Sequence, residues 1–301
     1  MSKSNTMIRK TLYALFSLLL FVLLLQGCVT EESCYRGMLG DGLRPTFLNS
    51  DGTVATDSMA RIAGVYKFVN GQFAGALEPI SDSTYALPIN DCDNIEVVAL
   101  ATHISDDFNM ETANSDTKLS DVWASLMSTT QGNLQIYSGR VWYGRWTYPS
   151  GEHLKGVVTL PMTNHAARVT VVVDNLKRCY GEGTYAVKVS GFCRSIAYDG
   201  SVRGEAIDYR PKVVISDDRL TASAVCSLPA SAKGITVEVT RDRQPVLTAV
   251  ATGDGQPITL QAGEDKIVKI DAITATTTIS VSNRHDASSY FEIHRSRVGV
   301  R

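Results

Sequence analysis

The chain has 301 residues with 44% hydrophobic content, which is typical of a packed globular protein. Its formal net charge of −2 comes from 29 basic and 31 acidic residues, and this balance argues against the strongly basic face of a nucleic-acid-binding protein. The length is enough for two ordinary domains.

Residues 1–27 have the features of a secretory signal peptide. Three basic residues precede the apolar run Thr11–Leu25, which is shorter than the ~18–20 residues that span a bilayer as a helix. The segment Leu25–Cys28 (LQGC) resembles a bacterial lipobox. We therefore predict that Cys28 is lipidated and holds the protein on the cell outer membrane, since two or more acyl chains anchor a protein almost permanently.

Residues 28–44 are polar and contain several glycines, so we expect a lipidated tether here. Glu31 and Glu32 directly follow the lipid cysteine and resemble a surface-export signal. A solvated linker explains them equally well, and the sequence leaves both interpretations open.

Residues 45–152 are predicted to form an N-terminal β-sandwich domain. The apolar run Ile62–Val69 is followed by Asn70-Gly71, a strong hairpin signal, and by a return strand over 72–77. Further strands are expected over 83–89 and over 94–104, where the run is apolar on both faces, as in a central strand.

One segment of this domain has a helical pattern. Apolar residues recur at helical spacing through 117–131, with Ser115 or Asp116 as a candidate N-cap. We therefore predict one short amphipathic helix in the first domain.

A turn at Tyr148–Gly151 marks the expected domain boundary, and residues 153–301 are assigned to a C-terminal β-sandwich domain. Strands are expected over 156–162, 168–176, 184–191, 213–216, 220–228, 234–241, 246–252, 257–260, 266–272 and 276–283. Short strands at this spacing, separated by turns, favour antiparallel sandwiches. The predicted fold is all-β, with two tandem sandwiches.

Five cysteines remain beside the lipidated one, in an exported chain where disulfides persist. Because five is odd, at least one thiol is free or pairs outside the chain. The sequence leaves the pairing open among Cys34, Cys92, Cys179, Cys193 and Cys226.

No catalytic or metal-binding motif is found. The five histidines do not occur at metal-ligand spacing, and the nucleophile-elbow, phosphate-loop and dinucleotide-binding patterns are absent. We expect no enzymatic activity, no catalytic residues, no metal and no cofactor.

An aromatic cluster suggests a second function. Trp142, Tyr143, Trp146 and Tyr148 lie within seven residues, and Trp142 and Trp146 would share one face of a strand. Exposed on a surface, these two indoles could form a platform for a glycan; buried, they would pack in the core.

The order of these features resembles a known family. The lipobox is followed by Cys34, by the strand Ala60–Phe68 (ARIAGVYKF), by the strand Val97–Ala101 (VVALA) and by Trp142–Gly144 (WYG). A strand pair around Thr163–Val171 (TNHAARVTV) completes the pattern. This order is similar to that of the fimbrillin-like lipoproteins of the Bacteroidales, of the FimB/Mfa type of anchor subunit for type V pili.

The resemblance implies two tandem transthyretin-like β-sandwich domains that assemble with other fimbrial subunits by donating a β-strand to a neighbour. The tail Ser289–Arg301 is a candidate donor strand, and the alternative is that it forms the last strand of its own sandwich. Phe291 and Ile293 share one face of this tail, and Val298 and Val300 share another.

Family members of the shaft and tip types are cut after an arginine near the N-terminus. Arg36 and Arg44 are the candidate cut sites here, and a cut at either would separate Cys28 from the body. The alternative is that both belong to a solvated linker. We predict a structural, lipid-anchored outer-membrane protein that serves as a fimbrial anchor or accessory subunit, with glycan binding as the alternative function.

Overall fold

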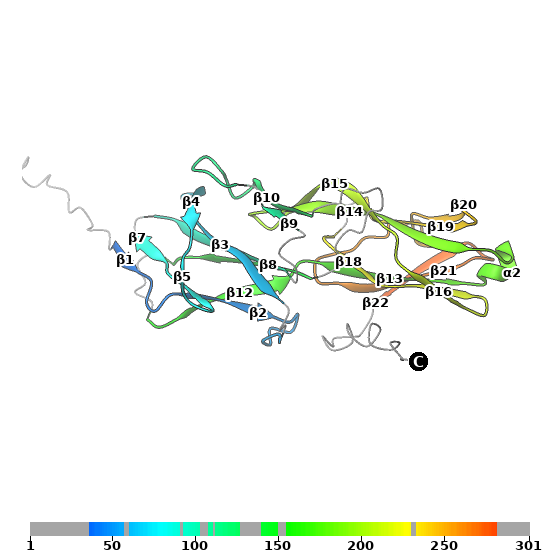
Figure 1. Cartoon of the computed structure of the whole chain (residues 1–301), viewed down its shortest axis with the longest axis horizontal. Coiled ribbons are helices and arrows are strands. Elements are labelled where there is room, and N and C mark those ends of the chain that lie inside the picture. The colour runs from blue at the N-terminus through cyan, green and yellow to red at the C-terminus, as the bar shows by residue number, and fades with distance from the viewer. Residues whose placement is uncertain are drawn as a thin grey trace, which may run out of the picture.

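A computed structural model describes residues 36–56, 60–90, 93–102, 108–110, 112–126, 140–149, 155–229 and 233–281. The molecule is elongated, with strand β1 (Arg36–Met38) at one end and helix α2 (Leu176–Tyr180) at the other (Figure 1). The all-β prediction is confirmed, since strands form nearly all of the regular structure in these ranges.

The N-terminal half is built on one eight-stranded sheet in the order β4-β3-β8-β11-β12-β2-β6-β5. Its strands are β2 (Leu43–Leu48), β3 (Arg61–Val69), β4 (Gln72–Ala76), β5 (Pro79–Ser81), β6 (Thr84–Tyr85), β8 (Ile95–Thr102), β11 (Val141–Thr147) and β12 (Val158–Asn164). A small second sheet pairs β1 with β7 (Pro88–Asn90).

Strand β8 is the centre of this sheet and is buried along its whole length. Val97 and Ala99 pack on one face with the N-terminal core, whereas Val98 and Leu100 pack on the other face with residues of the C-terminal half. An apolar run without alternation is what a strand covered on both faces requires.

The predicted hairpin between β3 and β4 is confirmed. Asn70 and Gly71 occupy the turn with φ of 52° and 81°, which are the left-handed values that such a turn needs.

The C-terminal half consists of two sheets. One contains β9 (Phe108–Met110), β10 (Val122–Leu126), β14 (Tyr185–Ala197), β15 (Val202–Tyr209), β19 (Thr236–Arg241) and β20 (Gln244–Ala249). The other contains β13 (Ala167–Asp174), β16 (Val213–Ser216), β17 (Arg219–Ala222), β18 (Val225–Ser227), β21 (Asp265–Asp271) and β22 (Thr276–Val281). Alternating residues such as Val169, Val171 and Val173 are buried between the two sheets.

The tether predicted for residues 28–44 is wrong in its described part. β1 and the start of β2 belong to the folded body, and Leu39 and Leu43 are 1% and 0% exposed. These two leucines fill the N-terminal core, and Gly42 turns the chain between Leu39 and Leu43 with a φ of 105°.

The helix predicted for residues 117–131 is also wrong where the chain is described. Val122–Leu126 forms strand β10, which pairs with β9 and with β14. Pairing with strands distant in sequence outweighs the local helical spacing here.

The expected domain division at residues 152 and 153 differs from the sheet arrangement. β12 lies after that boundary but pairs with β11 and β2 of the N-terminal sheet, so the chain changes from one half to the other at His165 and Ala166. β9 and β10 precede the boundary but join the sheet of β14. The turn after Tyr148 is therefore a connection within a sheet.

The two halves are joined by an aromatic cluster around Tyr198, in the turn between β14 and β15. Its ring is 1% exposed and lies 4.9 Å from the ring of Phe68 and 5.9 Å from that of Tyr66, measured between centroids. The Tyr143 hydroxyl donates to the backbone carbonyl of Tyr198 across 2.7 Å. The β14–β15 turn thus packs directly on the N-terminal sheet.

Candidate functional site

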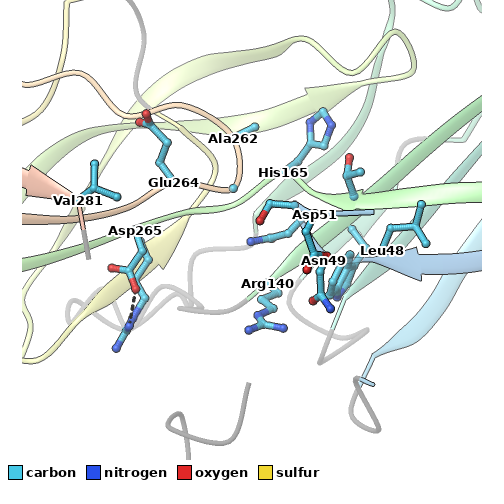
Figure 2. A pocket seen from close by; sticks show the side chains of 15 residues that line it. Leu48, Asn49, Asp51, Arg140, His165, Ala262, Glu264, Asp265 and Val281 are labelled. Atoms are coloured by element: carbon cyan, nitrogen blue, oxygen red, sulfur yellow. Dashed lines mark hydrogen bonds and ion pairs between the residues drawn. The ribbon is translucent and has the colours of Figure 1, made fainter. Parts of the chain in front are cut away.

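A cavity of about 580 Å³ lies where the two halves meet. The N-terminal half contributes the end of β2, the start of β11 and the end of β12, and the C-terminal half contributes β13, the loop before β21 and the end of β22 (Figure 2). Its lining residues are Leu48–Asp51, Arg140, Trp142, Thr163–His165, Arg168, Ala262–Asp265 and Val281.

Three charged groups of this cavity, Arg168, Asp265 and Arg140, are engaged with neighbouring side chains. Arg168 Nη1 lies 2.7 Å from Asp265 Oδ2, and both side chains are mostly buried. The guanidinium of Arg140 lies 5.8 Å from the ring centroid of Trp142, in cation–π geometry. These contacts fix the walls of the cavity and give it no strong charge of one sign.

His165 lies at the hinge between β12 and β13 and lines the cavity. Its ring is 4.7 Å from that of Tyr143, and burial lowers the pKa of its imidazole. Among the described residues, no hydrogen bond connects this ring to a nucleophilic side chain, so the cavity provides a shaped space without a nucleophile–base pair.

The second feature of the site is strand β22, which runs toward the cavity and ends at its wall. β22 is the last strand of its sheet, pairs with β21 on one side, and has no partner strand on the other side among the residues that the structure describes. The backbone N–H of Gly253 donates to the carbonyl of Thr277 across 2.8 Å, so a loop covers the start of β22.

Burial decreases along the inner face of β22. Thr277, Ile279 and Val281 share this face because side chains alternate along a strand. Thr277 is 4% exposed, Ile279 is half-buried against the C-terminal core, and Val281 is 69% exposed at the cavity (Figure 2). In the part of the chain that the structure describes, the sandwich is therefore closed at the start of β22 and less covered at its end.

The predicted aromatic platform for a glycan is not formed. Trp142 is 1% exposed, and its ring lies 5.1 Å from that of Phe47. Trp146 is half-buried against the same N-terminal core. The two indoles do share one face of β11, as expected, but that face points inward.

The two candidate cut sites both lie in strands. Arg36 begins β1 opposite Asn90, and Arg44 lies in β2 opposite Thr159 of β12. Both side chains are exposed, although the backbone at each position is paired in a sheet.

Several predicted residues lie outside the described ranges. These are the lipidation site Cys28 and the candidate donor-strand residues Phe291, Ile293, Val298 and Val300. Cys34 and Cys92 are also outside, and no disulfide joins Cys179, Cys193 and Cys226 to one another.

Within the described ranges, no group of His, Cys, Asp or Glu side chains is arranged to hold a metal ion. No helix in these ranges has the length and apolarity to cross a membrane.

Sequence reasoning predicted β22 as a strand but missed its open edge, because pairing depends on strands distant in sequence. It also missed the cavity residues Arg140, His165 and Arg168. A usable signal was Arg168 itself, a charged residue near the start of a valine-rich strand, which is expected to have a partner of opposite charge.

Comparison with known families and structures identifies similar proteins. The family model described as "Fimbrillin-A associated anchor proteins Mfa1 and Mfa2" matches residues 66–293. No curated protein sequence is significantly similar to the chain.

Solved structures share the fold at low identity. The fimbrial anchor protein Mfa2 from Porphyromonas gingivalis has a TM-score of 0.56 at 16% identity, with 80% of this chain and 96% of that chain covered. A Bacteroides thetaiotaomicron protein described as polysaccharide-binding has a TM-score of 0.56 at 13% identity, covering 80% and 94%. A further protein of that organism, described as an adhesin, has a TM-score of 0.50 at 15% identity, covering 83% and 97%.

Proposed function

Because the chain belongs to the family of fimbrillin-A associated anchor proteins Mfa1 and Mfa2, we propose that it holds a fimbria to the outer membrane through a lipid on Cys28. Its partners are fimbrial subunits, joined by pairing of β-strands. The alternative as a glycan binder loses its support, since Trp142 is buried.

The observation that carries this proposal is the position of β1 at one end of an elongated body (Figure 1). Arg36 follows Cys28 by eight residues, and eight residues reach at most ~26–29 Å at 3.3–3.6 Å each. A lipid on Cys28 would therefore hold the molecule by its end and close to the bilayer. The sides and the opposite end of the body would remain accessible to fimbrial subunits.

Strand pairing suits this role because backbone hydrogen bonds provide affinity and alternating side chains provide specificity. A protein that is pulled on by a fimbria needs a contact that spreads the load over many bonds, and a shared sheet supplies it.

The test is the variant Cys28→Ala in cells that produce the fimbria. We expect acyl groups on Cys28 by mass spectrometry of the wild type, and we expect the variant to release both the protein and the fimbriae into the medium. Cys179→Ala is a matched control, because it removes an exposed free thiol at the far end of the molecule. Unchanged surface retention of Cys28→Ala would contradict the lipid tether.

The same mass spectrum tests proteolytic maturation. A mature N-terminus at Gly37 or Pro45 would show cleavage after Arg36 or Arg44 and would favour a shaft or tip subunit. Arg44 is the second residue of β2 and is paired with β12, so cleavage after it would separate β1, Leu43 and Arg44 from the rest of the sheet.

A further inference from the structure

We propose that the end of the body that carries β1 contacts the phospholipid surface of the membrane through the exposed side chains of Met38, Ile80 and Val157, which we call the end patch. This inference rests on the proposed function, because a lipid on Cys28 is what brings this end to the bilayer. It adds a second contact with the membrane, made by the folded body, and with it a fixed orientation of the long axis.

The end patch consists of apolar side chains that are exposed. Met38 ends β1 and is 50% exposed, Ile80 lies in β5 and is 59% exposed, and Val157 directly precedes β12 and is 39% exposed. A single exposed apolar residue is ordinary, whereas several that gather on one surface indicate a contact with a protein or with a membrane.

The turn after β1 holds Val157 at this end of the molecule. The backbone N–H of Asp41 donates to the carbonyl of Gly156 across 3.0 Å. The backbone N–H of Val158 donates to the carbonyl of Gly42 across 2.9 Å. Val157 is the residue between these two hydrogen bonds, so it lies beside the turn.

The same turn brings Ile80 and Met38 to this place. A Cβ atom built on Gly42 would lie 2.9 Å from Cδ1 of Ile80, so the isoleucine side chain rests directly on this glycine. Met38 is followed directly by the buried Leu39, whose carbonyl accepts a hydrogen bond from the N–H of Gly42 and so closes the turn. Three segments that are distant in sequence thus bring exposed apolar side chains to one turn.

The tether decides which partner meets the end patch. Met38 follows Cys28 by ten residues, and ten residues span at most ~33–36 Å at 3.3–3.6 Å each. β1 and β5 lie toward the same end of the long axis (Figure 1). A lipidated chain therefore keeps the patch within reach of the bilayer at all times, and this high local concentration makes even a weak contact persistent.

The charges beside the end patch suit the head groups of phospholipids. Exposed charged residues lie within three positions of the patch residues in the sequence; they are Arg36, Asp41, Glu78, Asp82 and Lys155. Basic side chains can lay their apolar stems on such a surface while their charged ends reach phosphate groups. Because both signs are present, the surface matches zwitterionic head groups, which carry both a phosphate and an ammonium group.

The occupant is therefore the surface of a phospholipid bilayer. Contacts of this kind gain strength from the apolar area that enters the boundary between head groups and acyl chains. A fimbrial subunit and a second copy of this chain are the other occupants, and the experiment separates them.

The experiment places the full lipidated chain in phosphatidylcholine vesicles that contain a phospholipid with a photoreactive diazirine on its acyl chain. After illumination, peptide mass spectrometry locates the cross-links. The variant is Ile80→Asp, and its matched control is Ile273→Asp, since Ile273 is an isoleucine with a similar exposure of 52%. Ile273 lies at the opposite end, because its neighbour Ala272 accepts a hydrogen bond from Cys179 of α2 (Figure 1).

We expect cross-links on Met38, Ile80 and Val157 and none on Ile273. Ile80→Asp should lower the cross-linking of Met38 and Val157 about fivefold or more, because a carboxylate that enters an apolar layer loses its hydration. Ile273→Asp should cross-link like the wild type. Thermal unfolding checks that both variants are folded.

Equal cross-linking of the two variants, or cross-links confined to residues before Arg36, would overturn the membrane contact of the body. Acyl groups found on Cys28 in the same sample would leave the anchor function intact. A chain that neither carries acyl groups nor sediments with the vesicles would overturn both proposals.

Two further outcomes would overturn the bilayer as the occupant. If the variant Cys28→Ala is a dimer in sedimentation and the added change Ile80→Asp separates it, the end patch binds a second copy. If Ile80→Asp releases bound fimbriae from the vesicles while the cross-links between Met38 and lipid are unchanged, the end patch binds a fimbrial subunit.

Discussion

The aromatic cluster around Tyr198 leads to the prediction that Tyr198→Ala strongly destabilises the protein and uncouples its two halves. The Tyr198 ring is 1% exposed and packs edge-on against Phe68 and Tyr66 of the N-terminal sheet. Truncating a buried aromatic side chain to alanine costs about 3–5 kcal/mol. Since ordinary domains have only about 5–15 kcal/mol of stability, this loss is a large part of the total.

The assay is urea unfolding followed by two signals. All proteins carry Trp123→Phe, because Trp123 lies in β10 of the C-terminal half. Tryptophan fluorescence then reports on Trp142 and Trp146 in the N-terminal half, and circular dichroism reports on all strands. We expect coincident transitions in the wild type, and in Tyr198→Ala a lower midpoint with separated transitions.

Tyr198→Phe is the control for this prediction, because it keeps the ring and the backbone carbonyl that accepts from Tyr143. It should lose no more than about 1.5 kcal/mol, the value of a typical hydrogen bond. A loss below about 1 kcal/mol in Tyr198→Ala, with the two signals still coincident, would refute the view that this cluster joins the halves.

Two further predictions concern other contacts. Gly144→Ala should lower the free energy of unfolding by about 1–3 kcal/mol, because the new Cβ would lie 2.6 Å from the carbonyl oxygen of Pro161. Gly253→Ala is the control and should be tolerated, since its Cβ would have no neighbour closer than 3.7 Å. Equal melting temperatures of the two variants in thermal unfolding would contradict this prediction. Hydrogen bonds from Arg219 and Lys269 hold the pKa of the Asp174 carboxyl below its usual value near 3.8. The wild type should therefore be more stable than Asp174→Asn by a constant amount above that pH, and this difference should disappear as the pH falls through the lowered pKa. Unfolding of the two proteins at a series of acidic pH values measures the difference.

The strands were predictable where local pattern and tertiary environment agree. β8 is apolar from Val97 to Ala101 and is buried on both faces, and Asn70-Gly71 forms the turn that its two residues favour. In both cases the residues that determine the structure are neighbours in the sequence.

The errors arose where distant strands decide the structure. Val122–Leu126 has helical spacing but pairs with β14, about 70 residues later, as the hydrogen bond between Ser125 and Ser195 shows. The glycine-rich start of the chain suggested a tether, but Leu39 and Leu43 complete a core whose other members follow much later. The inward orientation of Trp142 likewise depends on Phe47, about 95 residues earlier.

The candidate site could be predicted only in part, for the same reason. The sequence shows that Thr276–Val281 has strong β propensity, but whether its outer side is paired depends on the order of strands in the sheet. An edge is a property of topology, and local patterns do not determine it.

The near-continuity of β12 and β13, separated only by His165 and Ala166, has a mechanical consequence. A tension applied between the N-terminal end and β22 would pass from β2 to β12, along β13, and then through β21 to β22, and each step is a lateral pairing of strands. These strands run along the long axis of the molecule (Figure 1), so the force acts in shear and loads all the hydrogen bonds of a ladder together. A ladder loaded in this way yields at much higher force than one that is unzipped bond by bond, so the body resists extension along its long axis.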